Sequence, residues 1–314
     1  MKKFVLTIIT FSAALLSTQV IACASCGCSL SSDWGTQGVS SSEGLKIDLR
    51  YDYLNQNESR HGTGKLGTYP SGQEQEVYTK NNYLTAAFEY NWSAKWGVNI
   101  FLPYIDRDHL TNGPDGTATS SSHTQSIGDV KAVMRYSFED DGSYGVQFGV
   151  KLPTGSHTQN FSGGDAIGTQ LDRGLQPGTG TTDAIIGAYR FGSLSKDWDY
   201  FTQITTQLPL NSSDDYKPGN SVNLNLGFRN MSYESFVPQV QINARWAAKD
   251  SGNSPYASPE DSGGQTIYIS PGMTVPLSEK IQAYGFVQLP IYQNLNGYQL
   301  APRYTVSVGT RISF

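Results

Sequence analysis

The stretch Arg303-Tyr-Thr-Val-Ser-Val-Gly-Thr-Arg-Ile-Ser-Phe314 alternates strictly between two kinds of side chain. One face carries Tyr304, Val306, Val308, Ile312 and Phe314, and the other carries Thr305, Ser307, Gly309 and Arg311. Side chains of a β-strand point alternately to its two faces, so this pattern predicts a strand that is apolar on one side only. An aromatic final residue is typical of a membrane β-barrel strand, and we expect Phe314 to be a C-terminal assembly signal read by the barrel-assembly machinery.

The first 24 residues have the order of regions found in a secretory signal peptide. Two lysines precede an apolar run from Phe4 to Leu16, and small residues follow. Cleavage before Ser25 fits the Ala-x-Ala rule, whereas Val20-Ile-Ala-Cys23 resembles a degenerate lipobox that would leave a lipidated Cys23. We expect export of the chain, and both processing routes stay open.

The composition excludes some classes of protein. The 314 residues carry 27 acidic and 22 basic side chains, a net charge of -5, so we expect no nucleic-acid partner. Beyond the signal, no run approaches the roughly 18 to 20 apolar residues of a membrane helix, and the mean hydropathy is -0.38. A β-barrel is compatible with this average because lipid-facing and interior residues alternate. The 19 Tyr, 13 Phe and 5 Trp suffice for aromatic girdles in contact with outer-membrane lipid.

Period-two alternation predicts about twelve strands, within a range of about 12 to 14, each near the 9 to 11 residues of a tilted membrane strand. They lie near residues 45–54, 82–92, 96–105, 127–138, 144–153, 182–191, 198–209, 221–229, 236–246, 266–275, 281–292 and 303–314. Short connections alternate with longer loops near 55–81, 106–126, 154–181, 210–220, 247–265 and 293–302.

This asymmetry of the connections is typical of outer-membrane barrels, which have short periplasmic turns and long extracellular loops. We therefore predict an all-β fold in which residues 44–314 form a transmembrane antiparallel up-and-down β-barrel. The location is the outer membrane of a Gram-negative bacterium, with both termini in the periplasm.

The strand residues of opposite parity are largely polar and are predicted to line the interior. The lumen-lining candidates are Lys46, Asp48, Arg50, Asp129, Lys131, Arg135, Lys151, Arg229, Arg245, Tyr284, Phe286, Gln288 and Arg311. Tyr292 is expected to point inward beside Tyr284 and Phe286. Basic residues outnumber acidic ones, which favours anionic or weakly acidic aromatic solutes. A closed structural barrel is the alternative, because eight strands are packed solid while 16 to 18 leave a channel.

Three segments carry a family resemblance: Gly149-Val-Lys-Leu-Pro-Thr-Gly155, Leu175-Gln-Pro-Gly-Thr-Gly-Thr-Thr-Asp183 and Phe286-Val-Gln-Leu-Pro-Ile-Tyr-Gln293. In this order they resemble the outer-membrane family grouped as transporters of the MetA pathway of phenol degradation. The resemblance implies a channel, with small aromatic or apolar compounds as the solute class. From the residues themselves, Pro153 ends a strand because it has no N–H to donate, and the glycines allow the loop to turn.

All three cysteines fall early in the chain, as Cys23, Cys26 and Cys28. Residues 25–43 are expected to form a periplasmic segment in which Cys26 and Cys28 are candidates for a disulfide, a redox pair or part of a soft-metal site. Attachment of haem c is excluded because His does not follow the Cys-x-x-Cys. These thiols motivate the alternative function, a structural or electron-transfer barrel that partners a periplasmic redox protein.

The four histidines are the candidates for catalytic residues. His61, His109, His123 and His157 all fall in predicted loops. His109 follows two aspartates and His157 follows a serine, which offers a base and a nucleophile, but in different loops and in no known barrel-hydrolase motif. We therefore predict a non-enzyme without cofactors, an outer-membrane channel for passive passage of small solutes.

Overall fold

The computed structural model describes residue 37, residues 43–70 and residues 72–314. The predicted signal peptide and all three cysteines lie outside the described residues. Among those that are described, no helix is long and apolar enough to cross a membrane. The helical elements here are two short 3-10 turns, η1 (Arg173–Leu175) and η2 (Pro259–Asp261), so the predicted all-β class is confirmed.

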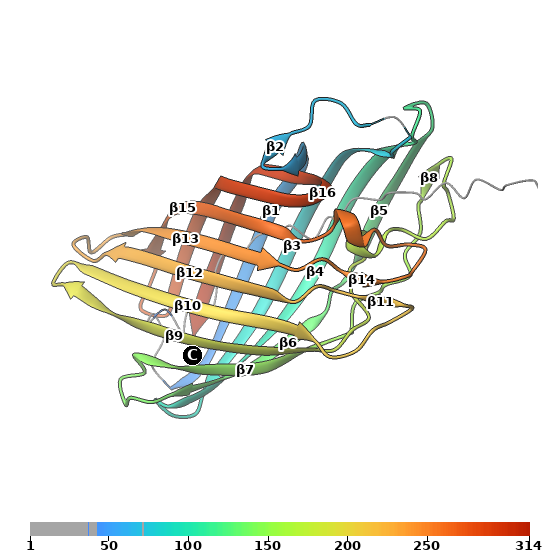
Figure 1. Cartoon of the computed structure of the whole chain (residues 1–314). Coiled ribbons are helices and arrows are strands. Elements are labelled where there is room, and N and C mark those ends of the chain that lie inside the picture. The colour runs from blue at the N-terminus through green and yellow to red at the C-terminus, as the bar shows by residue number, and fades with distance from the viewer. Residues whose placement is uncertain (1–36, 38–42, 71) are drawn as a thin grey trace, which may run out of the picture.

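Eleven strands of the described chain form the wall of a closed antiparallel barrel (Figure 1). They are β1 (Gly44–Gly62), β3 (Gln75–Asn91), β4 (Trp96–Asn112), β6 (Val130–Ser137), β7 (Tyr144–Leu152), β9 (Asp183–Ser195), β10 (Trp198–Pro209), β12 (Ser221–Asn230), β13 (Val237–Ala247), β15 (Gly264–Pro276) and β16 (Ile281–Ser313). Each pairs with its neighbours along the chain, and β16 pairs with β1 to close the ring. Outside the wall lie β2 (Gly64–Lys65), β5 (Thr119–Ile127), β8 (Gly163–Gly164), β11 (Tyr216–Lys217) and β14 (Ser251–Gly252).

Strand β16 passes through the wall twice. Its first half pairs with β15 up to Leu295, and its second half pairs with β1 from Tyr298 onward. A straight strand of 33 residues would be roughly 100 Å long, yet the Ser313 N–H donates to the Lys280 carbonyl at 2.8 Å. The chain therefore reverses near Gly297, whose φ is 56°. The two passes correspond to the predicted strands 281–292 and 303–314.

Several predicted loops are wrong because the strands extend into them. Strand β1 continues to Gly62, β3 begins at Gln75, and β4 reaches Asn112 and pairs with β5. The predicted loop 293–302 also lies inside β16. Figure 1 shows β3, β4 and β5 rising past the rest of the wall. In these extensions the outer row is no longer continuously apolar, as at Lys80, Asp106 and Asp108, so the period-two signal is lost although the strand continues.

The wall exposes apolar side chains and buries polar ones, the reverse of a soluble protein. Leu49, Leu84 and Tyr104 are 42%, 49% and 41% exposed, whereas Asp48 and Asp52 are only 6% and 2% exposed. On β4 the outward row is apolar through Tyr104 for about nine residues, the length that a tilted strand needs to span a bilayer.

Interior aromatic rings lie over glycines of the neighbouring strand. Phe201 of β10 is the partner of Gly227 in β12, and Phe286 of β16 is the partner of Gly272 in β15. A Cβ atom would lie 2.0 Å from the Phe201 ring at Gly227, and 2.3 Å from the Phe286 ring at Gly272. Both rings are buried. These glycines thus make the space that the interior rings occupy.

We predict that Gly227→Ala lowers the free energy of unfolding by about 1 to 3 kcal/mol, because the new methyl group displaces the buried Phe201 ring. Urea unfolding of the refolded protein, followed by tryptophan fluorescence, measures the change. Gly67→Ala is the control, since no atom lies within 4 Å of a Cβ there. Equal midpoints for the two variants would contradict this packing.

Candidate functional site: the barrel interior and its lid

The predicted lumen-lining residues lie on the inner side of the wall. Ten have buried side chains: Lys46, Asp48, Asp129, Arg135, Lys151, Arg229, Tyr284, Phe286, Gln288 and Arg311. The other three, Arg50, Lys131 and Arg245, are partly exposed. The parity of the sequence pattern therefore places these side chains together inside one ring.

Charged groups are linked across the interior near the short turns. Arg311 of β16 contacts Glu89 of β3 at 3.0 Å, skipping the intervening β1. Asn91 donates to Glu89 at 2.8 Å and in turn accepts from Arg135 of β6 at 2.8 Å. The links from Arg311 and from Arg135 each skip one strand, so the network connects β16, β3 and β6 across the interior.

Uncharged polar side chains are linked to each other on other strands of the interior. Gln203 donates to Gln147 at 2.8 Å, Asn243 donates to Asn225 at 2.8 Å, and Ser270 donates to Asn243 at 2.6 Å. These side chains come from β7, β10, β12, β13 and β15. They lie among charged interior residues of the same strands, such as Arg229 of β12 and Arg245 of β13.

Some interior cations have a carboxylate partner and others do not. Asp52 pairs with Arg50 at 2.8 Å, and Glu89 pairs with Arg311. Within the described chain, three other interior cations, Arg107, Lys131 and Arg135, form no ion pair, since each lacks a carboxylate within 4.0 Å. Arg107 instead donates to Asn81 at 2.6 Å and to the hydroxyl of Tyr83 at 2.9 Å.

Tyr292 does not point inward as predicted. It is 40% exposed, and Gln293 is buried in its place. The β15–β16 ladder shifts register here, because Tyr292 is the partner of Ile267 while Pro290 is the partner of Tyr268. The extra residue, Ile291, is a β-bulge. After it, the inward-facing and outward-facing positions of β16 are exchanged until the next irregularity. A proline at this point was the available signal for a bulge.

Three connections pack against each other at the long-loop end of the barrel, and we call them the lid: residues 153–182, 210–220 and 248–263. Gly174 of the first connection accepts from the interior Arg107 at 3.4 Å. Leu171 and Leu175 are fully buried and cluster with Phe161. The two leucines flanking a short polar segment were a signal of burial that the loop prediction missed.

The lid is fastened at its base by Lys151. Its ammonium contacts Asp129 at 2.9 Å and Asp183 at 3.2 Å, and it donates to the hydroxyl of Thr179. Asp129 also accepts from the N–H groups of Gly155 and Thr179, at 3.1 and 3.0 Å. The first two segments of the family resemblance therefore meet here, where one buried cation balances two buried carboxylates.

Arg173 joins the three connections of the lid. Its side chain is fully buried and contacts Asp214 at 3.1 Å and the Thr179 carbonyl at 2.7 Å. The guanidinium lies over the ring of Tyr216 at 4.8 Å, and the Arg173 N–H donates to the Tyr256 carbonyl at 2.7 Å. The sequence pattern did not identify this residue, because a single arginine in a polar loop carries no periodic signal.

Buried carboxylates collect beneath the lid. Glu76, Asp172 and Asp261 are 5%, 3% and 2% exposed, and in the described chain each has at least one carboxylate oxygen without a hydrogen-bond donor. Burial raises the pKa of Asp172 well above its ordinary value, and the nearby charges of Asp250 and Asp261 raise it further. Burial likewise raises the pKa values of Asp250 and Asp261.

The sequence predicted that all four histidines lie in loops, and this prediction is wrong for three of them. His61, His109 and His123 lie in strands, and only His157 lies in the lid. His109 is 1% exposed and shares a hydrogen bond of 2.9 Å with Thr79. His157 lies 3.4 Å from Asp214, beside Arg173.

We predict that Arg173→Ala loosens the lid, because it leaves the Thr179 carbonyl without this donor and removes the contact with the exposed Asp214, at a cost of about 1 to 3 kcal/mol. Limited proteolysis of the refolded protein should cut within the lid while the barrel stays intact. Lys249→Ala is the control, because its ion pair with Glu260 is at the surface and contributes roughly 0 to 1 kcal/mol. Equal protection of the two variants would contradict the role of Arg173.

We also predict that the lid loosens as pH rises. An aspartic acid whose pKa is raised in the folded state stabilises that state in its protonated form. This stabilisation is complete only below the ordinary pKa of 3.8, and it is lost as pH rises toward the raised pKa. The groups around Asp172 are Glu76, Asp250, Asp261 and Arg173. Lid proteolysis between pH 4 and 8 measures the effect, which Asp172→Asn should weaken and the exposed Asp115→Asn should not. A pH-independent lid would contradict it.

Comparison with known proteins identifies the fold. An outer-membrane channel from Pseudomonas putida F1 has a TM-score of 0.62 at 12% identity, covering 87% of this chain and 96% of that chain. The β domain of the Bordetella autotransporter Brka has a TM-score of 0.50 at 13% identity, covering 87% of this chain and 100% of that chain. No family model and no curated protein matches the sequence, so the phenol-pathway resemblance stays a prediction. The chain shares the β-barrel fold of outer-membrane proteins.

Proposed function

We propose that the protein is a channel in the outer membrane of a Gram-negative bacterium, for passive passage of small solutes. The observation that carries this proposal is a closed wall with an apolar exterior and a charged, hydrogen-bonded interior. The fold shared with a bacterial outer-membrane channel supports it. The short turns and both termini lie in the periplasm, after removal of residues 1–24. Phe314, 65% exposed at the end of the last strand, serves as the assembly signal.

The solutes are small anionic or weakly acidic aromatic compounds. The positive charges of Arg107, Lys131 and Arg135, which have no carboxylate within 4.0 Å, support the preference for anions. The interior rings of Tyr284 and Phe286, whose centroids are 6.2 Å apart, offer an apolar surface beside that charge. The lid then controls entry from the long-loop end, since its buried residues cover the interior Arg107 and His109.

We expect discrete single-channel conductance with a preference for anions when the refolded mature protein is placed in a planar bilayer. Lys131→Gln should reduce the anion-to-cation permeability ratio by about two- to fivefold, since one interior charge contributes roughly 1 kcal/mol at close range in water. Lys80→Gln is the matched control, because Lys80 lies on the outer face between the buried Thr79 and Asn81. A folded barrel without conductance, with or without Arg173→Ala, would overturn the proposal.

A further inference from the structure

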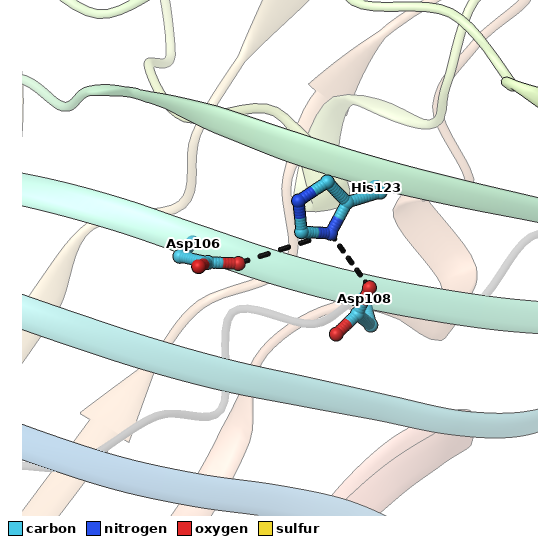
Figure 2. A group of neighbouring side chains, drawn as sticks. All are labelled: Asp106, Asp108 and His123. Carbon is cyan, nitrogen blue, oxygen red and sulfur yellow. Dashed lines mark hydrogen bonds and ion pairs between the residues drawn. The ribbon is translucent and has the colours of Figure 1, made fainter.

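A compact group of metal-ligating side chains lies on the outer face of the barrel, above the apolar band. Figure 2 shows Asp106 and Asp108 of β4 beside His123 of β5. Asp108 and His123 are direct partners in the β4–β5 ladder, and Asp106 lies two residues before Asp108. Residues two apart on a strand share a face, so the backbone pairing itself sets the three side chains side by side.

The distances suit one metal ion. His123 Nδ1 lies 2.7 Å from Asp108 Oδ1 and 3.8 Å from Asp106 Oδ1. All three ligand atoms lie within 4.8 Å of one another. Around a zinc ion with bonds of 2.0 to 2.2 Å and tetrahedral angles, neighbouring ligand atoms are about 3.4 Å apart. The observed separations bracket that value, so small side-chain rotations suffice to bring all three atoms to one ion.

One carboxylate of this group has an oxygen that nothing in the described chain satisfies. Asp106 Oδ1 is shielded from solvent and has no hydrogen-bond donor, although it faces the imidazole. The other oxygen of Asp106 accepts from Gln125 Nε2 at 3.1 Å, which holds the carboxylate in this orientation. A shielded carboxylate oxygen without a partner is costly unless a cation is close to it.

The neighbouring cation does not fill this role. Lys80 of β3 is the ladder partner of Asp108. Its ammonium lies 4.7 Å from the centre of the Tyr78 ring instead. Among the described residues, no lysine or arginine lies within 4.0 Å of Asp106 or Asp108. In the described chain, the two adjacent carboxylates therefore have no lysine or arginine as an ion-pair partner.

We propose that Asp106, Asp108 and His123 bind one divalent transition-metal ion of the zinc type on the outer surface of the barrel. One imidazole and two carboxylates are ligands that zinc accepts, and water completes the coordination. The ion would link β5 to β4. This link would stabilise β5, because its other edge is paired with only the two residues of β8 in the described structure.

The test is a calorimetric titration of the refolded full-length protein with zinc, in a Cys23→Ser/Cys26→Ser/Cys28→Ser background so that thiols do not contribute. We expect one zinc ion per chain, and at least tenfold weaker binding in His123→Ala, Asp106→Asn and Asp108→Asn. His61→Ala and Asp115→Asn are matched controls at an exposed histidine and an exposed aspartate outside the group, and they should bind as the parent does. Heat-modifiable migration on gels checks that each variant is folded.

Absence of stoichiometric zinc binding in the parent would overturn the proposal, as would unchanged binding in His123→Ala. Calcium titration separates the remaining case: calcium prefers oxygen ligands, so calcium binding as tight as zinc, and insensitive to His123→Ala, would show an acidic patch and no metal site. Protease protection of β5 that increases with zinc in the parent but not in His123→Ala would support the proposed fastening of β5.

Discussion

The structure depends on the pairing of β1 with the second pass of β16. This ladder runs from Lys46 opposite Ser313 to His61 opposite Tyr298, and it removes the two edges that an open sheet would leave. In a bilayer the backbone N–H and C=O groups of an unpaired strand edge have no water to bond with. A sheet can therefore span a bilayer only when it is closed. Once the ring is closed, each strand residue faces either the outside or the interior. The chemistry of both surfaces then follows from sequence parity.

Closure also explains why the interior holds so much charge. A closed ring of strands leaves a space too wide for apolar side chains of one layer to fill, and polar side chains bond to each other across it. Arg311 and Glu89 meet over the intervening β1, and Gln203 reaches Gln147 over β9. Glycines opposite Phe201 and Phe286 adjust the same space locally. Arg107, Lys131 and Arg135 remain without a carboxylate partner after these pairings.

The sequence predicted the wall well because period two records an apolar outer row. Strand 198–209 was predicted with the bounds that the structure has, and the inward parity of residues such as Asp48 and Arg135 is reflected in their burial. The prediction was wrong where the outer row is not continuously apolar, because the alternation then no longer indicates a strand. Beyond Tyr104 the outer row of β4 becomes polar at Asp106 and Asp108, and at Ile291 a bulge reverses the parity. Contacts between distant loops, such as those of Arg173, have no periodic signature.

The lid shows how a motif can look like a turn and still be an anchor. Pro153 and the following glycine were interpreted as strand end and turn, which they are, but Gly155 also packs against Gly178 so closely that a Cβ at Gly155 would lie 2.8 Å from it. This contact brings the two ends of residues 153–182 together, so that Asp129 can accept from both. The positive charge of Lys151 offsets the cost of burying the carboxylates of Asp129 and Asp183 beside it. The base of the lid is therefore continuous with the barrel interior through Asp129 and Lys151.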